Sequence, residues 1–164
     1  MKKILNALFL TLLTVFTFSS CSDVPSPYDI LGEGDVPGLT GDGTKENPYD
    51  IASAQQKQDG SIAWVQGYIV GTIENYTDAS GSAKFAAPFT AKNNLLIAAS
   101  ETETNIKNCV VVQLVSGTDL YTKLNLVDNA DANLHKILSI QGSLEKFYGF
   151  PGVKSTTAAT LDGK

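Results

Sequence analysis

The sequence predicts a mainly β domain in the C-terminal part of the chain. Five segments rich in β-branched and aromatic residues follow one another after Gly60. A segment with room for a helix separates the third from the fourth, and glycines interrupt the first and the fourth. Interior glycines mark the bulges and bends that small barrels require. Five strands with a helix between the third and fourth are the layout of an OB-fold, so we predict a five-stranded OB-fold-like Greek-key barrel with one or two short helices.

The first 20 residues predict a lipoprotein signal peptide. Lys2 and Lys3 precede an apolar run over residues 4–18, which is shorter than the roughly 20 residues that span a bilayer as a helix. The run ends in "FSSC", which is similar to the lipobox of bacterial lipoproteins, where the cysteine carries the lipid and the signal is cut just before it. The sequence therefore predicts lipidation of Cys21. The alternative is an ordinary signal peptide that is cut nearby, with Cys21 incidental.

Residues 21–43 predict the lipidated cysteine and a flexible linker, because prolines and glycines are frequent there and lysine is absent. Ser22 follows the cysteine where, in the enterobacterial sorting rule, aspartate would retain the protein in the inner membrane, so we expect an anchor in the outer membrane. Asp23 and Asp29 form a sparse version of the acidic export signal of Bacteroidota surface lipoproteins. Both the periplasmic face and the cell surface remain open, and residues 44–164 are expected to form the folded domain.

The domain is expected to open with a short helix over residues 51–58, capped by Asp50 and ended by Gly60. The first strand is "SIAWVQGYIVGTI" and the fourth lies in "HKILSIQGSLEKF". Apolar residues and glycine alternate on one face of each strand, and these faces are expected to point into the barrel. The matched positions are Val65, Gly67 and Ile69 in the first strand, and Ile140, Gly142 and Leu144 in the fourth.

The remaining elements follow from the same patterns. Residues 93–100 and 108–115 predict the second and third strands, and residues 118–124 predict a short helix. A turn at residues 149–152 leads into a last strand over residues 153–160.

Three stretches carry a resemblance to a known family: "GDGTKENPYDIASA", "WVQGYIVGTI" and "LHKILSIQGSLEKFYGFPGVKS". They resemble an uncharacterised OB-fold-like domain of Bacteroidota lipoproteins and secreted proteins, over residues 41–161. The resemblance implies the same fold and a location in the cell envelope. It brings no activity and no site residues with it.

Charge limits the ligands that the domain is suited to bind. From Cys21 onward the chain has 17 acidic residues and, of the 12 basic residues, the ten lysines that follow Lys2 and Lys3, so its side chains sum to −7. Arginine, the usual reader of phosphate and guanine, is absent. Such a chain is poorly suited to general polyanion binding.

We predict no catalytic residue, metal or cofactor. His135 is the one histidine, and neither Cys109 nor any serine lies in a nucleophile motif. Cys109 is expected to be a buried free thiol. "NADAN" (residues 129–133) begins like a calcium loop but lacks the required glycine and glutamate, and "GDGTKEN" is a second acidic loop; both are expected to be solvated turns.

Aromatic residues are the predicted binding groups. Trp64 and Tyr68 should project outward from the first strand, and aromatic residues gather in the loops after the first and fourth strands. These loops close over the ligand in OB-folds, and aromatic rings stack bases or sugars or bury apolar peptide side chains. The alternative is that the helix or the loops cover these rings and form a second small core. The full candidate set is Trp64, Tyr68, Tyr76, Phe85, Phe89, Phe147, Tyr148 and Phe150.

Three functions are consistent with these observations. The first is a non-catalytic envelope module that binds a glycan, a peptide or a partner protein through its aromatic loops. The second is binding of single-stranded nucleic acid along the lysines of the two loops, which the missing arginines disfavour. The third is a structural or scaffold role in an outer-membrane complex. The loop lysines are Lys84, Lys92, Lys146 and Lys154.

Overall fold

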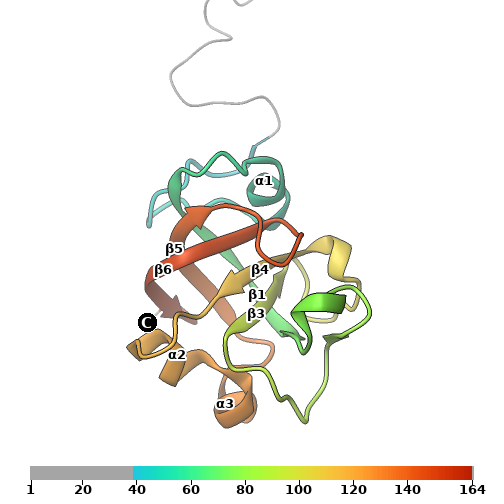
Figure 1. Ribbon diagram of the computed structural model, residues 1–164. Helices are drawn as coiled ribbons and strands as arrows, with labels where there is room; N and C mark the ends of the chain where they lie inside the picture. Colours follow the sequence, from blue (N-terminus) through green and yellow to red (C-terminus); the bar gives the residue numbers. More distant parts are fainter. Residues whose placement is uncertain (1–38, 164) are drawn as a thin grey trace, which may run out of the picture. The chain divides into compact units, whose positions relative to one another are not determined.

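A computed structural model describes residues 39–163 of the chain (Figure 1). The predicted signal peptide, Cys21 and most of the predicted linker lie outside these residues. None of the helices in residues 39–163 is long and apolar enough to span a membrane.

The described residues form short helices and a sheet of six strands, which confirms the predicted mainly β fold. The helices are α1 (Ile51–Gln56), η2 (Tyr76–Asp78), η3 (Ile106–Asn108), α2 (Asp119–Leu124) and α3 (Leu126–Asn133). The strands are β1 (Ile62–Ile73), β2 (Ala83–Lys84), β3 (Asn94–Ala98), β4 (Cys109–Gln113), β5 (Ile137–Leu144) and β6 (Gly152–Leu161).

The sheet curves into a barrel-like structure because the long strand β1 pairs with both β3 and β5. The remaining pairs are β3 with β4, β4 with β6, and β6 with β5. The parallel pairing of β4 with β6 is short, with Val111 opposite Gly152 and Val112 opposite Val153. The short edge strand β2, which the sequence did not predict, pairs with the end of β1.

Two of the predicted glycine bends lie at shifts in strand register. The pairing of β1 with β3 shifts between Ile69 and Gly71, and the pairing of β5 with β6 shifts between Gln141 and Ser143, on either side of Gly142. A β-carbon at Gly71 would collide with the carbonyl oxygen of Lys84, and one at Gly142 with that of Lys154. Glycine is therefore required at both bends.

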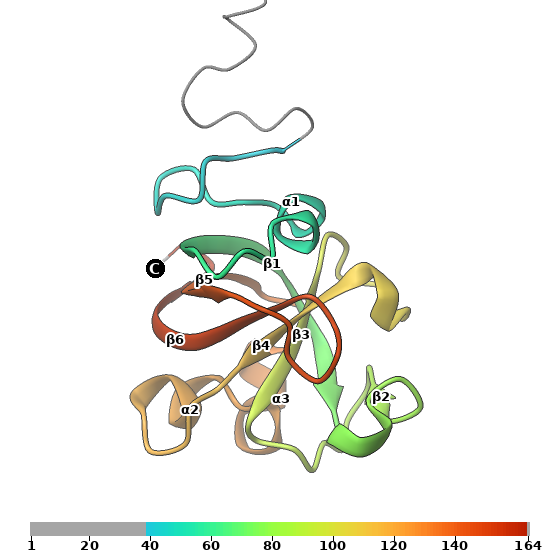
Figure 2. The ribbon, with the colours of Figure 1, turned by 45° about the horizontal axis from the view of Figure 1, so that its top comes forward.

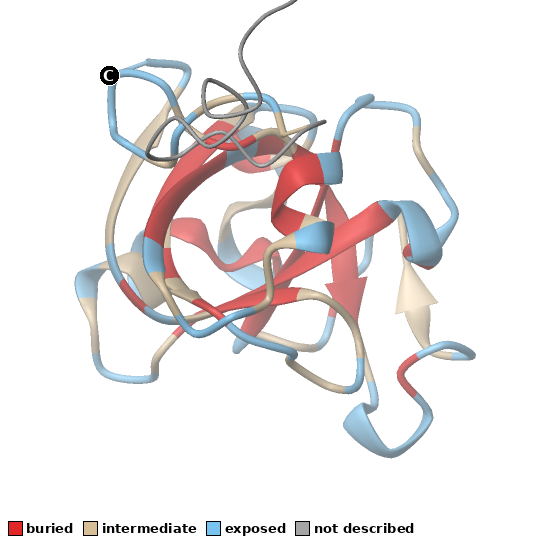
Figure 3. Ribbon diagram, turned by 90° about the horizontal axis from the view of Figure 1, so that it is seen from above, coloured by how far each residue is buried: buried red, intermediate tan, exposed pale blue. Residues whose placement is uncertain are grey.

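The barrel interior is the larger of two hydrophobic clusters. It contains the predicted inward positions Val65, Ile69, Ile140 and Leu144, all fully buried. Helix α1 lies over one end of the barrel (Figure 3), and α2 and α3 lie at the other end (Figure 1). The predicted cap of α1 is confirmed, because a side-chain oxygen of Asp50 accepts a hydrogen bond from the Ser53 N–H at 2.7 Å.

The second cluster lies outside the barrel, on the face of β1, β3 and β4 that points away from the interior. Val70, Leu96, Cys109 and Val111 are among its buried residues. The loop from β1 to β3 and the hairpin from β5 to β6 fold over this face, and the hairpin is seen beside β4 in Figures 1 and 2. The face therefore carries a second, smaller core.

One local prediction was wrong. Residues 129–133, expected to be a solvated turn, belong to helix α3. Asn125 caps this helix by accepting a hydrogen bond from the Asp128 N–H at 3.0 Å, and the helix is kinked at Asn129. Asn and Asp favour both turns and helix N-termini, so this run of residues did not distinguish a turn from a helix.

Candidate functional site

Five of the eight predicted aromatic residues gather over the outer face of β1, β3 and β4. Their rings pack partly buried against the second cluster and leave part of their surface in solvent. We call this group, together with the neighbouring Tyr76, the aromatic layer. The five residues are Tyr68, Phe85, Phe147, Tyr148 and Phe150.

The hairpin between β5 and β6 is closed by a tight turn. The Phe147 N–H donates to the Phe150 carbonyl oxygen at 2.9 Å, and the reverse bond measures 3.1 Å. Tyr148 and Gly149 occupy the two central positions, with φ of 53° and 84°. Positive φ at both central positions defines a type I′ turn, where Asn, Asp and Gly are preferred. Tyrosine at the first position is therefore unusual.

Contacts on two sides hold the Tyr148 side chain. Its ring stacks on Phe147 with a centroid separation of 4.0 Å and lies 6.0 Å from the ring of Tyr76. Its hydroxyl oxygen accepts a hydrogen bond from Nδ2 of Asn93 at 2.8 Å. The neighbouring Asn94 is fully buried and bonds both backbone groups of Ile73, which fixes the backbone beside Asn93.

Tyr76 is the most exposed member of the aromatic layer, with 70% of its surface accessible. Its loop is ordered by its own polar side chains. Asn75 accepts from the Thr77 N–H at 3.0 Å, and Asp78 accepts from the Gly81 N–H at 3.0 Å. Tyr76 and Tyr148 thus form an aromatic ridge on a fixed backbone.

The structure separates Trp64 and Phe89 from the aromatic layer. Trp64 is only 8% exposed, so it is covered, but it belongs to neither hydrophobic cluster and is not part of the second core that the alternative expected. The segment over residues 43–49 lies along β1: the Trp64 N–H donates to the Gly43 carbonyl, and the Tyr49 N–H donates to the Trp64 carbonyl. The Lys45 ammonium lies 5.7 Å from the centre of the indole ring. Phe89 belongs to the barrel interior.

The four loop lysines do not form one groove of unpaired positive charge. Lys92 forms an ion pair with Asp128 at 2.8 Å, and Lys154 forms one with Glu145 at 3.2 Å. Lys84 lies in β2, and Lys146 is exposed beside the hairpin. This arrangement lowers the positive charge that a nucleic-acid backbone would meet.

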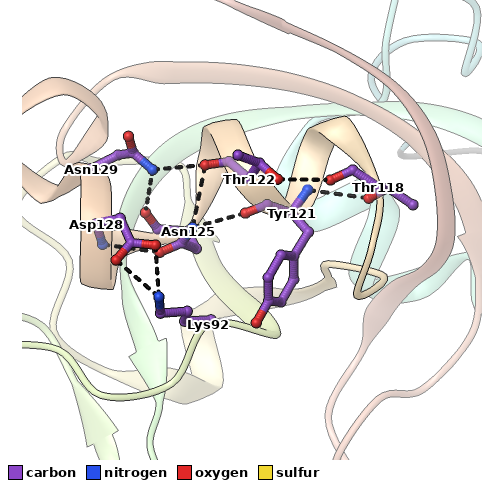
Figure 4. Close-up of polar contacts among 7 residues, drawn as sticks. All are labelled: Lys92, Thr118, Tyr121, Thr122, Asn125, Asp128 and Asn129. Carbon is purple, nitrogen blue, oxygen red and sulfur yellow. Dashed lines mark hydrogen bonds and ion pairs between the residues drawn. The ribbon is translucent and has the colours of Figure 1, made fainter.

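The polar network around Lys92 stabilises the junction between α2 and α3 (Figure 4). Thr118 caps α2 by accepting from the Tyr121 N–H, and the Asn125 amide donates to the Tyr121 carbonyl at 2.9 Å. The Asn129 amide donates to the Thr122 carbonyl at 3.0 Å. Because these groups satisfy helix ends, we assign the network a structural role.

Cys109 is fully buried, as the sequence predicts. Burial, with a smaller effect of the Glu103 carboxylate, raises the pKa of its thiol to about 12. A thiol with this pKa stays protonated at neutral pH and is a poor nucleophile. His135 is exposed, and its Nδ1 lies 2.8 Å from the Glu101 carbonyl oxygen. Within residues 39–163, no three metal-ligating side chains are grouped.

The sequence analysis did not identify Asn93 and Asn94 as important residues. Their side-chain hydrogen bonds connect the start of β3 to the hairpin and to the end of β1. Their signal is an Asn-Asn pair at the start of an otherwise apolar strand. A polar residue at a buried strand position needs a partner, and Asn94 finds it in the backbone of Ile73.

The match to a family model covers most of the described chain. The model "Domain of unknown function (DUF6359)" matches residues 49–162. The chain belongs to this family. The DUF6359 region begins just before α1 and ends just after β6, so it includes the barrel and the whole aromatic layer.

Other comparisons add little to the DUF6359 assignment. A search among curated proteins gives no match. Among solved structures, the chain is similar to the hypothetical protein ygiW from E. coli, with a TM-score of 0.36 and 10% sequence identity. That alignment covers 68% of this chain and 86% of the other.

Proposed function

We propose that this DUF6359 domain is a non-catalytic binding module whose contact surface is the aromatic ridge of Tyr76 and Tyr148. The observation that carries the proposal is the position of Tyr148 in the hairpin turn. A non-glycine residue in the left-handed region costs roughly 1–2 kcal/mol. Tyr148 occupies this region although Asn or Gly would fit the turn better, and its ring lies partly in solvent beside Tyr76.

The ligand class follows from the chemistry around the ridge. The loop over residues 75–82 consists mainly of Asn, Tyr, Thr, Ser and Gly, the composition that antibody loops use for adaptable recognition. Aromatic rings flanked by neutral polar groups suit a glycan, a peptide or the surface of an envelope protein. The net charge of the chain and the ion pairs of Lys92 and Lys154 disfavour nucleic acid.

We infer an OB-fold-like Greek-key barrel as the scaffold. The order of pairing, in which β1 joins β3 and β5 and the helices lie between β4 and β5, is the arrangement expected for that fold. In OB-folds a ligand lies across the face that β3 and β4 present here. The protein's own loops cover this face, so the proposed ligand contacts the outside of the aromatic layer.

We also propose that the protein is located in the cell envelope. The lipobox-like ending of the apolar run supports lipidation of Cys21 and an outer-membrane anchor, as in the Bacteroidota lipoproteins that the sequence resembles. Several acyl chains, at about 0.8 kcal/mol for each buried methylene, would hold the protein on the membrane. Residues 22–38 would separate the anchor from the domain.

A thermal-shift screen tests the binding proposal. A soluble form that begins at Ser22 is mixed with neutral oligosaccharides, envelope-derived peptides and single-stranded DNA. We expect a stabilising shift with a glycan or a peptide, because ligands that bind only the folded state raise its stability. Tyr76→Ala should reduce the shift, whereas Val127→Ala, at an exposed apolar position on α3, should leave it unchanged. A salt-sensitive shift with DNA alone would contradict the proposal.

A further inference from the structure

A hollow separate from the aromatic ridge lies where β1 exchanges one partner strand for the other. Tyr68 pairs with Ile137 of β5 on one side and with Ala98 of β3 on the other. The hollow has a volume of about 240 Å³. Pockets for drug-sized ligands measure roughly 300–1,000 Å³, so this one fits a single ring. Its lining residues are Asp50, Ile51, Gln66, Gly67, Tyr68, Ala99 and Ile137.

The polar groups of the hollow are oriented by bonds to the scaffold. The side-chain nitrogen of Gln66 donates to Oγ of Ser139 at 2.8 Å, and the side-chain oxygen of Gln66 takes no part in this bond. Within residues 39–163, no hydrogen bond involves that oxygen or the Tyr68 hydroxyl. Both groups are free to bond a ligand, and the partly buried Tyr68 ring supplies an apolar surface.

The charge of the hollow disfavours anions. No lysine is among the lining residues, so an anionic ligand finds no partner. Asp50 is the one charged residue, and its carboxylate already accepts from the Ser53 N–H at 2.7 Å. Because the end of α1 partly compensates this charge, the carboxylate acts mainly as a hydrogen-bond acceptor.

We propose that this hollow binds the ring of a neutral sugar. The sugar ring would lie against Tyr68. The hydroxyl groups of the sugar would donate to the side-chain oxygen of Gln66 and to the Asp50 carboxylate. Ile51 and Ile137 would contact its apolar C–H groups. The site is independent of the ridge of Tyr76 and Tyr148, so either site can exist without the other.

The test is an NMR titration of the isotope-labelled full chain in a detergent without sugar head groups. The probes are the methyl glycosides of glucose, galactose and mannose. We expect at least one of them, at millimolar concentration, to shift the backbone amide signals of Gly67, Tyr68 and Ala99. Signals of Tyr76 and Tyr148 serve to detect binding at the ridge instead.

Variants separate this site from unspecific sugar contact. Gln66→Ala should weaken binding about five- to tenfold, the factor expected for one lost hydrogen bond. Gln56→Ala changes an exposed glutamine of α1 outside the hollow and should leave the affinity unchanged. Tyr68→Phe keeps the ring and tests the hydroxyl if Gln66→Ala perturbs the fold.

Three results would overturn the proposal. The first is that none of the glycosides shifts the three amide signals. The second is that Gln66→Ala and Tyr68→Phe both bind as tightly as the parent chain. The third is that butylammonium ion occupies the hollow and the glycosides do not, which would identify a site for amines.

Discussion

Nδ2 of Asn93 lies 2.8 Å from the hydroxyl oxygen of Tyr148, and this hydrogen bond joins two loops that are 55 residues apart in the chain. Asn93 directly precedes β3, whereas Tyr148 lies at the tip of the hairpin between β5 and β6. The bond fixes the hairpin against the rest of the domain. The aromatic ridge is therefore held in place, and for the ligand that we propose this would lower the entropic cost of binding.

A double-mutant cycle measures this bond. Tyr148→Phe and Asn93→Ala should each lower the free energy of unfolding by about 0.5–1.5 kcal/mol, the usual net contribution of a hydrogen bond. The double variant should lose less than the sum of the two, because the same bond is removed only once. Urea unfolding of the soluble form gives these values. Tyr76→Phe is the control, since no hydrogen bond of the Tyr76 hydroxyl is found in residues 39–163. If the losses in free energy of unfolding for Asn93→Ala and Tyr148→Phe simply add in the double variant, the two side chains are not bonded.

The glycine bends give a second prediction. Gly71→Ala places a β-carbon against the Lys84 carbonyl, so the end of β1 and strand β2 must move apart. We expect a loss of about 1–3 kcal/mol or more in the free energy of unfolding. Gly117→Ala is the control, because Gly117 has open space around it and only a positive φ of 84°. A loss in Gly71→Ala no larger than the loss in Gly117→Ala would show that the end of β1 accommodates the β-carbon without the expected collision.

Local patterns were sufficient to predict most of the barrel. Alternation of apolar residues in β1 and β5 predicted the inward positions, and Asp50 predicted the start of α1, because these signals depend on neighbours in sequence. The helix α3 was missed since Asn and Asp favour turns and helix starts alike. Strand β2 is too short to leave a pattern, and it exists only because the loop after η2 returns to β1.

The candidate site was predicted in its composition and not in its arrangement. The pattern of β1 correctly placed Trp64 outside the barrel interior, but the segment that covers it lies 15 to 21 residues earlier in the chain. Phe89 shares its loop with Phe85, yet the two rings belong to different cores. Which of several loop aromatics becomes core depends on how the loop folds back, and no periodicity encodes this.

The buried thiol of Cys109 gives a prediction for alkaline pH. Its pKa is raised to about 12, from 9.0 for a free thiol, mainly because burial disfavours the charged form. The folded state therefore holds the proton more tightly than the unfolded state, and the stability that this provides is complete below pH 9 and is lost as the pH rises toward 12. Cys109→Ala should show a shallower loss of stability over this range. Identical alkaline profiles would place the thiol in contact with water.

The lipidation that we propose for Cys21 predicts where the protein partitions. In a bacterial host that processes lipoproteins, the parent chain should enter the detergent phase of a Triton X-114 extraction and gain mass from acyl chains. Cys21→Ser should move to the aqueous phase or keep its signal peptide, because serine cannot form the thioether. Cys109→Ser is the control and should partition like the parent. A parent chain cleaved after a different residue, without added mass, would favour the ordinary signal peptide.

The cap of α1 predicts a response to acid. Burial alone would raise the pKa of Asp50, but hydrogen bonds from Ser53 and its neighbours lower it on balance. The stability that the ionised carboxylate provides is thus present above the unfolded pKa near 3.9 and is lost as the pH falls through the lower folded value. Asp50→Ala should cost about 1 kcal/mol at neutral pH, and Asp50→Asn, an equally good cap that cannot ionise, should cost less. Unfolding measured from neutral pH to about pH 2 should show a smaller acid-induced loss in Asp50→Asn than in the parent, whereas matching slopes would assign the acid response to other carboxylates.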